Sequence, residues 1–138
     1  MRAKLLAVAG VTALFLCGCA QQSPPTEPVV AGPAAGEGGI PAYPAHERFI
    51  GALKGSGSAS IGSLVSEGTT VIVYLGCQSE GELELNVNNS APTPVPCGTL
   101  DEPTRTVFTE TSAKEEFSID VVSEAGPVYG LAVTEEAK

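Results

Sequence analysis

Polar and apolar residues alternate in two short segments of the second half of the chain. One segment covers residues 82–88 (ELELNVN) and the other covers residues 116–121 (EFSIDV). The apolar positions that share one side of these segments are Leu83, Leu85, Val87, Phe117, Ile119 and Val121. Alternation with a period of two is typical of a β-strand that buries one face. Both segments therefore predict strands with one face in the core and the other in solvent.

A third segment is apolar on both faces. Residues 69–77 (TTVIVYLGC) contain no charged residue and end in Cys77. Such a strand is buried on both sides, so we expect it at the centre of a sheet, with the opposing sheet on one face and a loop or a neighbour on the other. Four weaker strand patterns, bounded by Gly, Pro, Asn and Ser, occupy residues 49–53, 58–64, 105–111 and 128–134.

About seven strands without a convincing helix predict an all-β domain over residues 46–138. The expected fold is an antiparallel β-sandwich in a jelly-roll or immunoglobulin-like variant, with an open barrel as the alternative. The chain has no tryptophan. A true immunoglobulin domain packs a tryptophan against cysteines that lie much further apart in sequence than Cys77 and Cys97, so this form is disfavoured.

The N-terminus has the pattern of an export signal. Arg2 and Lys4 precede an apolar run over residues 5–16, which ends in small residues. A helix of that length rises about 18 Å, which is well short of the roughly 30 Å thickness of a hydrocarbon core. Residues 1–18 are therefore predicted to be a signal peptide and not a permanent membrane span.

The end of this signal, Leu16-Cys17-Gly18-Cys19, resembles the lipobox of bacterial lipoproteins. The resemblance covers only residues 1–19. It implies cleavage between Gly18 and Cys19 and a diacylglyceryl group on the Cys19 thiol, which would anchor the protein at the extracytoplasmic face of the cell membrane. Two or more acyl chains make such an anchor stable. The alternative is an ordinary signal peptidase site within the same small residues.

A proline- and glycine-rich stretch follows the lipobox. Residues 20–45 contain six prolines and four glycines, with no apolar period. This composition buries too little surface to offset the entropy of ordering the chain. Residues 19–45 are therefore predicted to be the lipidated N-terminus and a linker that holds the domain away from the membrane.

Two cysteines lie beyond the signal and the lipobox, Cys77 and Cys97. In an oxidising compartment such a pair predicts a disulfide, and closing this loop stabilises the fold by about 3 kcal/mol in the chain-entropy model. Two sulfurs without a CxxC pair cannot supply the ligands of a structural zinc site, and the chain has one histidine. No metal site or cofactor is expected.

The negative net charge of the chain restricts the classes of partner that it can bind. The chain from Cys19 onward keeps 5 of the 7 basic residues and all 16 acidic ones, so its formal charge is −11. Nucleic acid is excluded as a partner because Lys and Arg contacts to phosphate supply most of the affinity for it. The same charge favours solubility and repulsion from anionic lipid headgroups.

The sequence predicts no catalytic residue. His46 lies at the junction of linker and domain, where a solvated role is expected, and neither a G-x-S-x-G elbow nor a P-loop occurs. The predicted function is that of a non-catalytic module that binds an envelope protein or a glycan. The alternative is a cation-dependent carbohydrate-binding or hydrolytic envelope protein that uses acidic loop residues such as Asp101 and Glu102.

Overall fold

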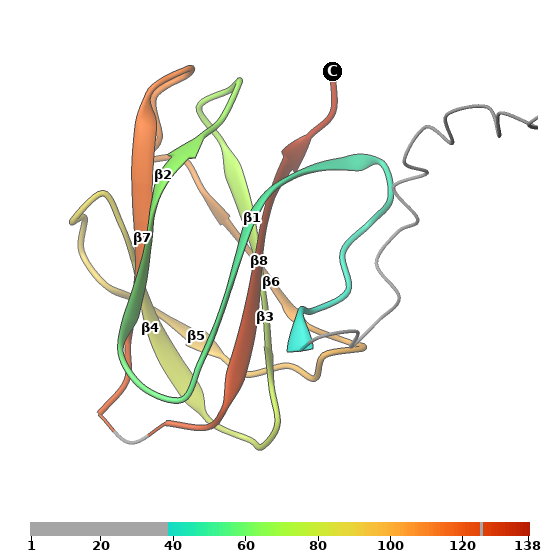
Figure 1. Ribbon diagram of the computed structural model, residues 1–138, viewed down its shortest axis with the longest axis vertical. Coiled ribbons are helices and arrows are strands. Elements are labelled where there is room, and N and C mark those ends of the chain that lie inside the picture. The colour runs from blue at the N-terminus through green and yellow to red at the C-terminus, as the bar shows by residue number, and fades with distance from the viewer. Residues whose placement is uncertain (1–38, 125) are drawn as a thin grey trace, which may run out of the picture.

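The computed structural model describes residues 39–124 and 126–138 of the chain, and these residues form a β-sandwich (Figure 1). The strands are β1 (Glu47–Gly55), β2 (Ala59–Val65), β3 (Val71–Cys77), β4 (Glu82–Val87), β5 (Thr93–Pro96), β6 (Thr104–Phe108), β7 (Glu116–Val122) and β8 (Tyr129–Glu136). Sheet A has the order β1-β8-β3-β6, and sheet B has the order β2-β7-β4-β5. All strand pairs are antiparallel.

The connectivity is that of a jelly roll. Consecutive strands alternate between the sheets, and only β4 and β5 follow each other within one sheet. Two four-stranded sheets wound in this way are characteristic of the jelly roll. The predicted β-sandwich is confirmed in its jelly-roll form, with eight strands in place of about seven.

The additional strand is β5, a proline-containing segment for which the sequence pattern predicted no strand. Pro94 and Pro96 cannot donate to a sheet, and proline is therefore confined to edge strands or bulges. β5 is such an edge strand, since β4 is its one partner in sheet B. Between the prolines, Val95 is buried opposite Leu83.

The main core lies between the two sheets and follows the predicted faces. The alternating residues of β4 and β7 that were expected to face inward are all buried, while Glu82, Glu84 and Glu116 are exposed. Val71, Val73 and Leu75 of β3 pack into the same cluster. Every residue of β3 is buried, which confirms the prediction that this strand is covered on both faces.

The second face of β3 is covered by the segment that precedes β1, residues 39–46, called the strap below. In Figure 1 the strap lies beside sheet A, on the side away from sheet B. Ile40 and Tyr43 of the strap pack against a small cluster of Ile72, Tyr74 and Ala132. Most of the strap falls within the predicted linker, yet it contributes to the fold by covering this face.

A pair of glycines in sheet A lets the backbones of two other segments approach the sheet closely. Gly76 and Gly130 are cross-strand partners in β3 and β8. A Cβ atom at Gly130 would overlap the carbonyl oxygen of Gly39, and one at Gly76 would lie 2.7 Å from the carbonyl oxygen of Thr99. The glycine pair therefore forms a notch that admits the start of the strap and the loop after β5.

The predicted disulfide is present. Cys77 and Cys97 are joined, with their Cα atoms 5.5 Å apart and a sequence separation of 20. The backbone amide of Cys77 donates to the carbonyl of Gly98 at 2.9 Å. The bridge therefore ties the end of β3 to the segment that follows β5. Within residues 39–124 and 126–138, no helix is long and apolar enough to cross a membrane.

Candidate functional site

The residues predicted for lipidation and cleavage, Gly18 and Cys19, lie outside the described residues, so both assignments stay predictions. The candidate acidic residues of the alternative function, Asp101 and Glu102, are exposed on the turn between β5 and β6. The Glu102 amide donates to the Thr99 hydroxyl at 2.9 Å, and the Thr99 amide donates to the Glu102 carbonyl at 3.1 Å. These bonds hold the turn and leave both carboxylates in solvent.

The acidic residues are spread over the surface. In the part of the chain that the structure describes, no group of three or more His, Cys, Asp or Glu side chains could hold a metal ion. Asp101 and Glu102 therefore have no described acidic neighbours that complete a cation site. The one histidine, His46, is exposed at the end of the strap.

One of the two buried carboxylates among the described residues belongs to a polar network on the outer face of sheet A. Glu47 is only 5% exposed. The Tyr74 hydroxyl donates to its Oε1 at 2.9 Å, and the Thr134 hydroxyl donates to its Oε2 at 2.5 Å. Burial, together with the bond to Glu47, raises the pKa of Tyr74, while Arg105 acts in the opposite direction. Both carboxylate oxygens are satisfied, which gives Glu47 a structural role.

A second buried carboxylate lies on the neighbouring strand. Glu135 of β8 forms an ion pair with Arg48, its cross-strand partner in β1. The other carboxylate oxygen accepts a hydrogen bond of 2.8 Å from the backbone amide of Glu67. Glu135 therefore ties three elements together: β8, β1 and the loop between β2 and β3.

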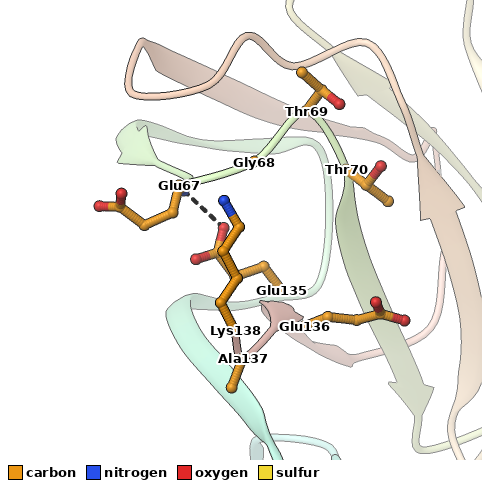
Figure 2. Close-up of a pocket in the computed structure, with 8 residues that line it drawn as sticks. All are labelled: Glu67, Gly68, Thr69, Thr70, Glu135, Glu136, Ala137 and Lys138. Carbon is orange, nitrogen blue, oxygen red and sulfur yellow. Dashed lines mark hydrogen bonds between the residues drawn. The ribbon is translucent and has the colours of Figure 1, made fainter.

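A groove opens at this end of the sandwich, with a volume of about 280 Å³. Figure 2 shows the Glu67–Glu135 hydrogen bond, with Lys138 beside it. The lining residues are Glu67, Gly68, Thr69, Thr70, Glu135, Glu136, Ala137 and Lys138. Since Glu135 is already engaged, the free groups are exposed carboxylates, hydroxyls and an ammonium group. Such a lining can exchange hydrogen bonds with a polar or charged group.

The outer face of sheet B is open and acidic. Glu82 and Glu84 of β4 and Glu116 of β7 are exposed there, and Asp120 lies between Ser60 and Asn86 in the register. The Asn86 side-chain oxygen is buried without a hydrogen-bond partner. This face is solvated, as the alternating pattern predicted.

Sequence reasoning missed the Glu47 network. Glu47 stands next to the predicted linker, and its partners Tyr74 and Thr134 are 27 and 87 residues away in sequence. The available signals were the lone hydroxyls of Tyr74 and Thr134 inside apolar strands, since a buried hydroxyl requires a partner.

Comparison with known proteins shows no family. No protein-family model matches the chain, and no curated protein matches it. Among solved structures, it is similar to the exo-β-1,3-galactanase of Phanerochaete chrysosporium with galactose, at 14% identity and a TM-score of 0.40. That match covers 64% of this chain and 27% of the other. A likeness this loose carries no argument about function.

Proposed function

We propose that the protein is a lipoprotein anchored at the extracytoplasmic face of the cell membrane, whose jelly-roll domain is a non-catalytic module that binds an envelope partner. The lipobox at Cys19 supports the anchor. The proline-rich segment after it supports a tether that carries the domain away from the bilayer. The partner is an envelope protein or a glycan and not a nucleic acid, because the chain is strongly acidic.

The distribution of the ionisable groups supports binding over catalysis. Among the residues that the structure describes, Glu47 and Glu135 are the buried carboxylates, and both are held by hydroxyl, guanidinium or amide donors. A general acid or base must reach a substrate in a shielded site, and buried groups already engaged in this way do not. The surfaces offered to a partner are the strand edges, the loops and the acidic face of sheet B.

No observation favours the cation-dependent alternative over this proposal. Its candidate residues Asp101 and Glu102 lie in an exposed turn, without a group of metal-binding side chains among the described residues. A thermal melt with and without calcium compares the two functions. We expect no change in the melting temperature, whereas an increase of several degrees would support the alternative.

The anchor is tested by intact mass and by fractionation. The mature protein should begin at Cys19, carry acyl chains, and have the mass of an oxidised Cys77–Cys97 pair. The variant Cys19→Ser should leave the membrane fraction, because one apolar signal helix of this length does not span a bilayer. If Cys19→Ser stays with the membrane to the same extent as the natural protein, the proposed anchor is wrong.

Binding is tested by cross-linking in intact cells. The lipidated protein should yield a specific cross-linked partner, and an unrelated lipoprotein at the same expression level serves as the control. A blank result, under conditions in which the control captures its own known partner, would contradict the proposed binding function.

A further inference from the structure

The sandwich has four strand edges, and three of them are interrupted. β5 carries Pro94 and Pro96, which cannot donate to an added strand. In β2 the register shifts between Ile61 and Leu64, and in β1 it shifts between Phe49 and Gly51. Prolines and bulges of this kind prevent unwanted pairing at sheet edges. These three edges are therefore poor templates for another chain.

The fourth edge, β6, is regular. It pairs with β3 in an unbroken register from Val71↔Phe108 to Leu75↔Thr104. Among the described residues, β3 is its one strand partner, and no backbone hydrogen bond from a loop reaches residues 104–108. β6 contains no proline or glycine. It therefore presents alternate backbone donors and acceptors to solvent, which is the geometry required for strand addition.

The side chains of β6 also suit a neighbouring strand. Val107 is 46% exposed, the highest value among the exposed large hydrophobic residues of the described chain. A β-branched residue in this position packs well against a similar residue on an adjacent strand. Arg105, on the same face, is the cross-strand partner of Tyr74, so Val107 is the apolar contact that the edge offers.

The charges around β6 select the kind of partner. Asp101 and Glu102 precede the strand and Glu110 follows it, and all three are exposed. If two copies paired antiparallel through β6, the acidic residues that precede the strand in one copy would approach Glu110 of the other copy. Like charges brought together in this way repel each other. A second copy is therefore disfavoured, whereas a segment with basic ends is electrostatically complementary.

We propose that β6 is the docking edge for an extended segment of a cationic partner protein, which adds to sheet A as a further antiparallel strand. The segment carries Lys or Arg at both ends, near Glu102 and Glu110, and a β-branched residue opposite Val107. Main-chain hydrogen bonds supply the affinity and the flanking charges supply the specificity. This inference rests on the proposed binding function and names the surface and the chemistry of the partner.

The probe is a short peptide in which alternating valine and threonine residues are flanked by paired lysines. It is titrated into the chain from residue 19 to 138 carrying Cys19→Ser, which includes every described residue. We expect amide NMR shifts and slowed hydrogen exchange to concentrate at residues 104–108. Affinity should decrease with salt, because the end contacts are exposed ion pairs.

Matched variants separate the edge from general charge attraction. Val107→Asn should weaken binding about fivefold through loss of the cross-strand contact. Val128→Asn should have no effect, since Val128 is 45% exposed but lies outside the edge. The same peptide with N-methylated valines should not bind, because it keeps the charge but cannot form the ladder, and a glutamate-flanked peptide should not bind either.

Several results would overturn the inference: shifts centred on Glu82 and Glu84, equal binding by Val107→Asn, or binding by the N-methylated peptide. Concentration-dependent self-association that Val107→Asn abolishes would make a second copy the occupant instead. In cells, the yield of the cross-linked partner should fall in Val107→Asn. An unchanged yield would contradict the docking edge at β6 but would still support the binding function. The absence of any partner would contradict the binding function itself.

Discussion

The outer faces of the two sheets differ, although both sheets pack the same kind of inner face against the core. Over β3 and β8, the outer face of sheet A is covered by the strap and holds the buried cluster of Ile72, Tyr74 and Ala132. The outer face of sheet B is bare, and its exposed positions are occupied by residues such as Glu84. One face behaves as a second core and the other as a surface.

The difference between the two outer faces explains why one sandwich contains both an alternating strand and a fully apolar strand. β4 alternates between apolar and polar residues because one of its faces meets water. β3 is apolar throughout because the strap protects its second face. Because of the strap, an outward-facing residue of β3 is buried, whereas an outward-facing glutamate of β4 is in water. The predictions below test this difference from the largest expected effect to the smallest.

Ile72→Ala should be the most destabilising of these changes. Ile72 is 1% exposed although it lies on an outer face, so removal of its side chain leaves a cavity and should lower the free energy of unfolding by about 2–5 kcal/mol. Glu84→Ala is the matched change on sheet B and should stay within about 0.5 kcal/mol. Urea unfolding measures both. Equal effects would mean that the strap does not form a second core.

Gly130→Ala should detach the strap. The new Cβ would overlap the Gly39 carbonyl oxygen, and overpacking of this kind costs about 1–3 kcal/mol. Gly62→Ala is the control, because a Cβ there meets no atom within 4 Å. Limited proteolysis should show faster cleavage within residues 39–46 for Gly130→Ala. Unchanged cleavage would show that the strap does not depend on the glycine notch.

Tyr74→Phe removes one of the two hydroxyl donors to the buried Glu47 carboxylate. Leaving a buried acceptor unsatisfied costs about 1–3 kcal/mol, and we expect the low end because Thr134 still donates. Thermal unfolding at neutral pH measures the loss. A Tyr43→Phe variant serves as a control for tyrosine removal on the same face, because no hydrogen bond to Glu47 is lost.

The raised pKa of Tyr74 predicts that the folded state loses stability at alkaline pH. Burial raises the pKa of Tyr74 and of Tyr129, so the folded state holds the phenol proton more tightly than the unfolded state. Stability from this source is complete below about pH 10, the unfolded tyrosine pKa, and is lost as the pH rises toward the folded value. Tyr74→Phe should show a shallower decrease above pH 10. A profile identical to that of the natural protein would contradict the assignment.

The smallest effect is expected on the acidic face. Glu84→Gln and Asp120→Asn remove like charges from sheet B and should raise the free energy of unfolding by a few tenths of a kcal/mol at low salt. The gain should vanish in high salt, because exposed charges are screened within about 10 Å at 0.1 M. Unfolding at two salt concentrations measures it. A gain that persists in high salt would mean that the residues act through packing and not through charge.

The sequence predicted the faces of the strands better than their arrangement. Period-two alternation identified the buried side of β4 and β7, because the inward residues Leu85 and Ile119 must leave water. The same logic placed β3 in a covered position. It could not identify β5, because Pro94 and Pro96 are typical of a loop. A strand is possible there because β5 lies at the edge of sheet B.

The long-range parts of the site could not be predicted in this way. The Glu47 network joins residues that are far apart in sequence, and pairing across such distances is set by the jelly-roll register. The strap has the composition of a linker, and its covering role depends on a glycine notch formed by two separate strands. Local patterns carry no information about either contact, whereas the disulfide was predictable because Cys77 and Cys97 are the pair left in a domain that the N-terminal pattern predicts to be exported.

The strap also determines how the domain responds to tension. A force applied from the N-terminal side of Gly39 acts first on the contacts that precede β1. These are the packing of Ile40 and Tyr43 and the backbone hydrogen bond from Ala42 to Leu100. A pull from this side therefore reaches the strap contacts before it reaches the two sheets, which the Cys77–Cys97 disulfide helps to hold.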